Sequence, residues 1–376
     1  MKKTIVIFSN PFGYGPTGNA IPVIKSLLDR SNGFEVVFAG SGLCMEVASG
    51  MSIRCVRLNE RDETEIEGFL KTIRCPYVIG SQNRFCVRVA KRAGIPCAFI
   101  DTLAWFWKEI PADHLLADEI FWIKFPQIQR KIPSGKKNIH IVSSIVTTIP
   151  SSGIKKYKQL IIHIGGAKYP LMEKLPYNYL NLISEGLNGL ATSSFFDRVL
   201  CAGGSEAIAY LKKRVANKSM SLVSLPKEQF VEELEKSSHM FTVAGVSSTL
   251  ESFALNVPVS FLLPLNLSQV ALKDVLDQQK VPTQSLEWDD YVDVSGNLRA
   301  MNERDALVEI DKYAKLVNRD EENATQFVKD FVKTARSVPD NTKQRKLIEH
   351  MGVSGGDEIA DILSNIWNLN LKNEYE

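Results

Sequence analysis

The sequence predicts an α/β protein made of two doubly wound domains, each with a parallel sheet covered by helices. Short apolar runs alternate with helical patterns along most of the chain, and a Pro-, Ser-, Gly- and Lys-rich segment interrupts this alternation near residue 150. Strands of a covered parallel sheet appear as continuous Val- and Ile-rich runs because helices bury both faces. The length of 376 residues exceeds the usual size of one domain, so two domains are expected.

The first domain is expected over residues 1–150. Its apolar runs are bounded by polar, helix-forming stretches, as βαβ units require. Predicted strands lie at 4–9, 34–40, 53–58, 77–81 and 96–101, and predicted helices at 19–29, 63–73 and 87–93.

The second domain is expected over residues 151–345, after a linker at 146–159. Residues 346–376 hold a last helix, near 357–369, that is expected to pack back on the first domain. Two such domains would face each other across a cleft at the carboxyl ends of their strands. Predicted strands lie at 159–166, 198–204, 220–226, 240–243 and 257–263, and predicted helices at 177–190, 206–215 and 227–236.

The segment Ser238–Gln269 has the order strand, turn, helix, strand, loop. Its Gly- and Ser-rich turn, 244–249, leads into a helix, and amides at a helix N-terminus suit a diphosphate. Glu251, expected two residues into that helix, can accept both hydroxyls of a ribose. Asn266 and Gln269, on the loop after the next strand, can hydrogen-bond a sugar ring. Together these features indicate a nucleotide-sugar site.

This segment resembles the donor-binding motif of glycosyltransferases of the GT-B fold, in particular the branch of the UDP-GlcNAc-dependent lipid II transferase and antibiotic glycosyltransferases. In that family a Gly-rich turn precedes a Glu that holds the donor ribose, and a Gln or Asn contacts the sugar. An ordinary βαβ turn with a surface Glu is the alternative. The resemblance implies donor contacts for the matching residues, which are Gly245, Ser247, Ser248, Thr249, Glu251, Asn266 and Gln269, for Gly165 and Gly166 near the phosphates, and for Leu225 at the base.

Gly13, Gly15 and Gly18 have the spacing of a dinucleotide-binding turn, which raises the alternative of a dehydrogenase. Two features disfavour it. The motif begins four residues after the predicted strand, and the next strand, 34–40, ends without an acidic residue for the ribose.

The same segment resembles the family pattern in which Gly-Gly-His opens the first helix and a Pro follows. Gly18, Asn19 and Pro22 match, but Asn19 stands where many relatives place a catalytic His. An amide cannot act as a general base near neutral pH. Asn19 is therefore expected to position the acceptor, with Gly15 and Gly18 beside it.

Asp101 is the predicted general base, because it ends the apolar strand 96–101 where cleft residues are expected. Trp105 and Trp107 follow closely, and apolar neighbours would raise the pKa of the carboxyl and could stack on an acceptor. The alternative is an Asp that caps the next helix beside a Trp-rich core face. The reserve candidates in the same loop are Glu109, Asp113 and His114.

The predicted function is an inverting, metal-independent glycosyltransferase that moves a sugar from a nucleoside diphosphate, expected to be UDP, to a small acceptor such as a nucleobase or natural-product intermediate. The retaining branch carries two glutamates with seven residues between them at the donor motif, whereas Val243 stands eight positions before Glu251. No DxD motif ends a predicted strand, so no metal is expected. The expected reaction uses the nucleoside diphosphate sugar as co-substrate and no cofactor. The alternatives are a UDP-sugar 2-epimerase-like enzyme and a non-catalytic nucleotide-sugar binding protein.

Charge, cysteine spacing and hydropathy indicate which binding partners and which cellular compartment to expect. The net charge is +2 without a long Lys/Arg block, so nucleic acid is not an expected partner. The six cysteines form no metal-binding or CxxC pattern. No apolar stretch is long enough for a signal segment or a membrane span, so a cytoplasmic protein is expected. The oligomeric state stays open, with a homodimer as one alternative.

Overall fold

The computed structural model describes residues 3–30, 33–48, 50–147, 157–172, 174–190, 195–217, 220–294 and 298–369. The chain divides into two compact units. The first comprises Met1–Thr147 with Glu349–Glu376, and the second comprises Thr148–Ile348. Most of the predicted linker, residues 148–156, lies outside the described residues.

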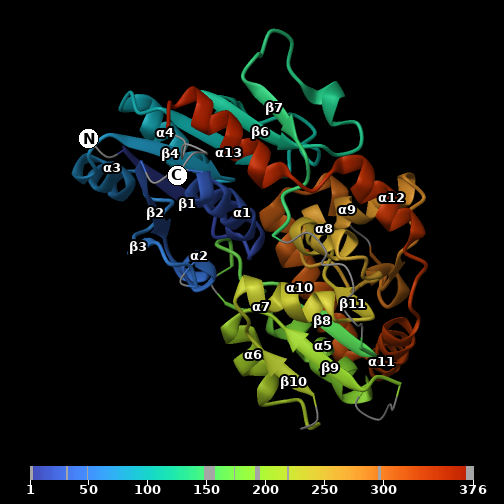
Figure 1. Ribbon diagram of the computed structural model, residues 1–376. Coiled ribbons are helices and arrows are strands. Elements are labelled where there is room, and N and C mark those ends of the chain that lie inside the picture. Colours follow the sequence, from blue (N-terminus) through green and yellow to red (C-terminus); the bar gives the residue numbers. More distant parts are fainter. Residues whose placement is uncertain are drawn as a thin grey trace. The chain divides into compact units, whose positions relative to one another are not determined.

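The first unit contains a seven-stranded sheet in the order β3-β2-β1-β4-β5-β6-β7, and every pairing in it is parallel (Figure 1). Five of these strands match the predicted ones, and β6 and β7 extend the sheet beyond them. The strands are β1 (Lys3–Ser9), β2 (Phe34–Gly40), β3 (Arg54–Arg57), β4 (Pro76–Ser81), β5 (Cys97–Asp101), β6 (Glu119–Ile123) and β7 (Ile139–Val142).

Helices connect the first five of these strands, whereas loops with short 3-10 turns connect β5 to β6 and β6 to β7. Side chains cap two of the helices: Asp62 accepts hydrogen bonds from first-turn amides of α3, and Asn83 from one of α4. The helices of this unit are α1 (Gly15–Arg30), α2 (Gly42–Ala48), α3 (Glu63–Thr72), α4 (Arg84–Arg92), the short 3-10 turns η1 (Ala112–Leu115) and η2 (Ile128–Lys131), and the last helix, α13 (Gly355–Ile366).

Helix α13 packs against α1, so the last helix belongs to the first unit (Figure 1). Glycine permits this close approach: a Cβ on Gly356 would lie 2.9 Å from the Cβ of Pro22, and one on Gly355 would collide with the carbonyl oxygen of Ser143. Arg30 forms ion pairs with Asp357 and Asp361, but both carboxylates are exposed, so these pairs contribute little to stability.

We expect Gly355→Ala to lower the free energy of unfolding by about 1–3 kcal/mol, because the methyl group overpacks the contact between α13 and Ser143. Urea denaturation measures this loss. The matched control is Gly68→Ala on α3, where no atom lies within 4 Å of the new methyl group. That helical substitution should be neutral or stabilising by about 0.5–1 kcal/mol. Equal stabilities of the two variants would contradict the packing argument.

The second unit contains a six-stranded parallel sheet in the order β10-β9-β8-β11-β12-β13. Its strands are β8 (Gln159–His163), β9 (Arg198–Ala202), β10 (Ser221–Val223), β11 (His239–Thr242), β12 (Val259–Phe261) and β13 (Gln284–Ser285). Its helices are α5 (Tyr177–Leu190), α6 (Ser205–Lys212), α7 (Lys227–Glu235), α8 (Val246–Ala254), α9 (Leu267–Gln278), α10 (Glu303–Arg319) and α11 (Glu321–Arg336), with the 3-10 turns η3 (Trp288–Asp290) and η4 (Leu298–Ala300), before α12 (Thr342–Met351).

A buried histidine on β11, His239, forms contacts with α11 and with the neighbouring strand β12. His239 lies with Nδ1 3.0 Å from the carbonyl oxygen of Ala335 and Nε2 2.9 Å from the hydroxyl of Ser260. Burial lowers the pKa of His239 to about 4, so the ring is neutral near neutral pH. The role of this histidine is therefore structural.

Candidate functional site

Three consecutive helices of the second unit begin at the carboxyl edge of its sheet without a side-chain cap. Helices α6, α7 and α8 follow β9, β10 and β11, and their N-cap residues are Gly204, Pro226 and Gly245. Helix N-termini carry positive partial charge, so this edge favours an anion. By contrast, side chains cap the later helices α9, α10 and α11, through Asn266, Asn302 and Asp320.

The turn into α8 is held by its own backbone. The Gly245 amide donates to the carbonyl of Val243 at 2.6 Å, and the Thr249 amide donates to the carbonyl of Gly245 at 3.0 Å. The Ser248 hydroxyl donates to the same carbonyl at 3.1 Å. Ser248 and Thr249 are buried, and Ser247 is half-buried in the first turn. The helix begins at Val246, earlier than the sequence predicts, so Glu251 lies in its second turn rather than its first.

A buried ion pair joins α8 to α7. Glu251 Oε1 lies 2.8 Å from Lys227 Nζ, and the two side chains are only 1% and 11% exposed. Lys227 is the first residue of α7. Its part in this site is absent from the sequence predictions, because no local pattern joins residues 24 positions apart.

His163, at the end of β8, lies close to this pair. Its Nδ1 is 3.2 Å from the Thr242 hydroxyl, and its ring packs against Phe230 at 4.7 Å between centroids. Desolvation, and next the positive charge of Lys227, lower the pKa of His163 to about 3. The ring is therefore neutral near neutral pH.

The loops after β8 and β9 pack backbone against backbone. Gly165 has φ +63°, a conformation that favours glycine. A Cβ on Gly204 would lie 2.5 Å from the carbonyl oxygen of Gly166, and one on Gly203 would collide with Ile164. The conformation and packing of these loops therefore explain why glycine occupies these positions. The phosphate contacts predicted for Gly165 and Gly166 stay predictions.

The side chains of Asn266 and Gln269 organise their own loop. Asn266 Oδ1 accepts hydrogen bonds from the Gln269 amide at 3.0 Å and the Ser268 hydroxyl at 2.8 Å. Gln269 Oε1 accepts one from the Leu265 amide at 2.6 Å. Both side chains are buried, and their contact with a sugar stays a prediction. Leu225, half-buried, lies in the loop before α7, where the predicted base contact would be.

In the first unit, Asp101 ends β5 as predicted, and its buried carboxylate is surrounded by donors. Oδ1 accepts a hydrogen bond from the Leu103 amide at 2.8 Å, and Oδ2 accepts one from Trp107 Nε1 at 3.2 Å. Oδ2 also lies 2.9 Å from Nδ1 of His114. A carboxylate only accepts, so this pairing keeps the proton on Nδ1 of the ring. The carboxylate therefore fixes the loop from 102 to 114, and its role as a base stays a prediction.

Asn19 also lies at this sheet edge. Asn19 Nδ2 donates to Thr102 Oγ1 at 3.0 Å, and Gln82 Nε2 donates to the same oxygen at 2.8 Å. Trp105 is buried and stacked on Phe125 at 4.5 Å, which makes it a core residue, whereas Trp107 is half-buried. The structure thus brings Asn19 to the residue next to Asp101. Gly15 and Gly18 lie in the first turn of α1.

Comparison with known proteins identifies the fold. No family model and no curated protein matches the sequence. UGT89C1 of Arabidopsis thaliana, complexed with UDP, has a TM-score of 0.60 and 12% identity, over 98% of this chain and 100% of that chain. A UDP-glucosyltransferase from Polygonum tinctorium has a TM-score of 0.55 and 13% identity, over 98% and 99%. A putative UDP-N-acetylglucosamine 2-epimerase from Listeria monocytogenes has a TM-score of 0.53 and 13% identity, over 100% of both chains.

The chain has the GT-B fold. The predicted fold class and the resemblance to GT-B proteins are confirmed at this level.

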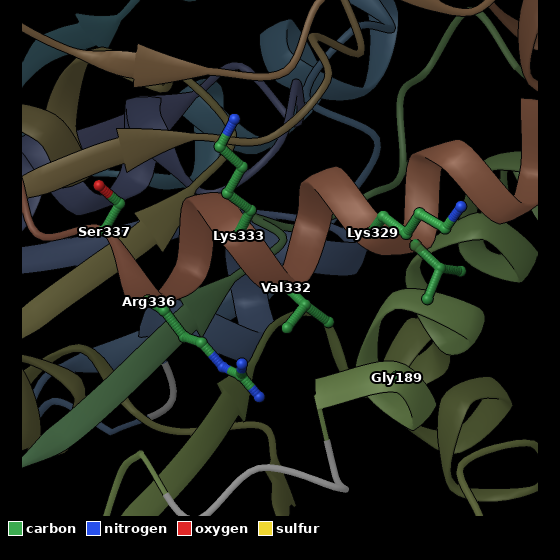
Figure 2. A pocket seen from close by; sticks show the side chains of 7 residues that line it. Gly189, Lys329, Val332, Lys333, Arg336 and Ser337 are labelled. Atoms are coloured by element: carbon green, nitrogen blue, oxygen red, sulfur yellow. The ribbon is translucent and has the colours of Figure 1, made fainter.

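The GT-B chain also has a surface hollow away from these strand ends. Its volume is about 660 Å³, and α11 and the end of α5 line it. The side chains of Lys329, Lys333 and Arg336 point in three different directions (Figure 2). They therefore do not converge on one anion, and no predicted site residue lines this hollow.

The described residues offer neither a metal-binding cluster nor a membrane-spanning helix. They hold no group of three or more His, Cys, Asp or Glu side chains that could bind a metal ion. Each helix among them is too short or too polar to cross a bilayer.

We expect Asp101→Asn to lower the free energy of unfolding by about 1.5–3 kcal/mol, because an amide cannot accept hydrogen bonds from all three donors. Chemical denaturation followed by tryptophan fluorescence measures this change. Asp113→Asn is the control from the same loop, since its pairs with Arg84 and Arg88 are partly exposed and contribute about 1 kcal/mol or less. A loss at Asp101 no larger than at Asp113 would contradict the assigned contacts.

Proposed function

We propose that this chain is a nucleotide-sugar enzyme whose second unit binds a nucleoside diphosphate sugar, with UDP as the nucleotide. The observation that carries the proposal is the buried carboxylate of Glu251 in the second turn of α8, a helix whose N-terminus has no side-chain cap. The first-turn amides of α8 would bind the diphosphate, and Glu251 one turn later would accept hydrogen bonds from the ribose hydroxyls. The UDP complex of UGT89C1, which shares the fold, supports UDP as the first ligand to test.

The proposed reaction is transfer of the sugar to a small acceptor with inversion. A base removes the acceptor proton as the acceptor oxygen attacks the anomeric carbon, and the bond from that carbon to the diphosphate breaks. Helix amides would stabilise the charge on the departing diphosphate. Asp101 is the proposed base, and His114 is the second candidate because Asp101 holds its Nδ1 and leaves Nε2 to act. Asn19 would position the acceptor.

A UDP-sugar 2-epimerase is the second candidate function. The observation that favours it is the likeness to the Listeria protein, whose TM-score of 0.53 is close to the 0.55 of the Polygonum glucosyltransferase. The engagement of Asp101 with three donors also weakens its assignment as a base. An epimerase would convert the UDP-sugar without an acceptor, whereas a transferase would release UDP only when an acceptor is present.

We expect UDP and a UDP-sugar to raise the melting temperature of the protein, because a ligand at 100 times its Kd stabilises the folded state by about 2.7 kcal/mol. A thermal-shift panel with UDP, UDP-sugars, other nucleoside diphosphates and NAD(P)H measures this effect. Glu251→Ala should abolish the shift, and the control Glu232→Ala, at an exposed position on α7, should retain it.

Stabilisation by NAD(P)H alone would overturn the proposal. It would favour a dinucleotide site at Gly13, Gly15 and Gly18 instead. The product assay then separates the two candidate functions: incubation of the UDP-sugar with and without an acceptor panel shows whether UDP release depends on an acceptor or whether the sugar is changed without one.

A further inference from the structure

The ammonium group of Lys227 occupies a central place at the carboxyl edge of the second sheet. Lys227 begins α7 after β10, and its Nζ contacts Glu251 on α8, which follows β11. Its charge also acts on His163 at the end of β8. Lys227 therefore links three strand ends: its own helix follows β10, its partner Glu251 lies on the helix after β11, and His163 ends β8.

The first position of a helix is electrostatically unfavourable for a lysine, and the contact of Lys227 with Glu251 offsets this cost. A cation at the first residue of a helix faces the positive end of that helix's dipole. The N-terminus of α8, the next helix, has no side-chain cap either. Burial of an ion pair costs desolvation energy that the attraction between the charges often fails to recover. Stability alone is therefore a weak reason for a lysine here, and an anion at this edge is a stronger one.

We propose that Lys227 is a donor-binding residue that exchanges partners: it pairs with Glu251 in the free protein and with the diphosphate when the nucleotide binds. This inference rests on the proposed function. The ribose hydroxyls would donate to Glu251 in place of the ammonium group, and the flexible lysine stem would let Nζ turn to the diphosphate beside the first turn of α8. No covalent bond changes in this step.

Because of this exchange, the affinity of the protein for a uridine compound depends on whether that compound carries a diphosphate. The ribose of uridine must displace Lys227 from Glu251, and uridine carries no anion that could pair with the displaced ammonium group. UDP carries a diphosphate, so the ribose can bind Glu251 while the diphosphate binds Lys227. The gain in affinity from uridine to UDP therefore measures how strongly Lys227 pairs with the diphosphate.

The test is calorimetric titration of the full chain with uridine, UMP and UDP. Lys227→Gln keeps a hydrogen-bond donor for Glu251 but removes the charge. We expect it to weaken UDP binding by about 10- to 100-fold while uridine binding changes by less than about threefold. Lys227→Arg should retain most of the gain from uridine to UDP. The control is Lys236→Gln at the other end of α7, where Lys236 pairs with Glu233, and it should leave both affinities unchanged.

A second variant keeps the test decisive if Lys227→Gln fails to fold. Glu251→Gln should weaken uridine binding but preserve the ratio of UDP to uridine affinity, because Lys227 remains to bind the diphosphate. A fall of that ratio overturns the inference.

The outcomes separate the two proposals. If the unaltered protein binds neither uridine nor UDP, the proposed function fails and the inference with it. If UDP binds and Lys227→Gln leaves its affinity unchanged, or weakens uridine and UDP equally, the inference fails and the proposed function stands.

Discussion

Parallel pairing of every strand in both sheets is the constraint on which the other features of this molecule depend. Because parallel neighbours need a crossover connection, the carboxyl ends of all strands in a unit meet at one edge. In the first unit that edge gathers Asn19, Thr102 and Asp101 from α1 and the end of β5. In the second it gathers His163, Lys227 and Glu251. Asn19 is far in the sequence from Asp101 and Thr102, and the three residues of the second group are far from one another.

The two edges differ in their polar chemistry. In the first unit the two residues at the end of β5 have partners within the chain: Asp101 meets three donors, and Thr102 accepts two hydrogen bonds. In the second unit three helices start without side-chain caps, and one buried lysine neutralises one buried glutamate. The second edge is therefore the better place for an external anion, which is why the proposed nucleotide site lies there.

The fold class was predictable from the sequence because burial on both faces gives most of the strands a continuous apolar run. Val- and Ile-rich runs predicted β1, β2, β4, β5 and β8 near their observed bounds. Strand β6 went without a prediction, since Trp122 interrupts the aliphatic pattern.

The site was less predictable, because its contacts join distant residues. The type and place of Glu251 follow from a local motif, but its pairing with Lys227 depends on how α7 packs on α8. The Ser and Thr residues before Glu251 predicted a loop, but they form the first helical turn of α8. Glu251 therefore lies in the second helical turn. Asp101 and His114 were both visible as candidates, but only the folded loop shows that one holds the other.

The most direct test of the account is a crystal structure of the protein with UDP. The account predicts diphosphate oxygens within hydrogen-bond distance of the amides of Val246 to Ser248, and ribose hydroxyls on the carboxylate of Glu251. A nucleotide bound at the Gly13 to Gly18 turn of the first unit, with the start of α8 empty, would contradict it.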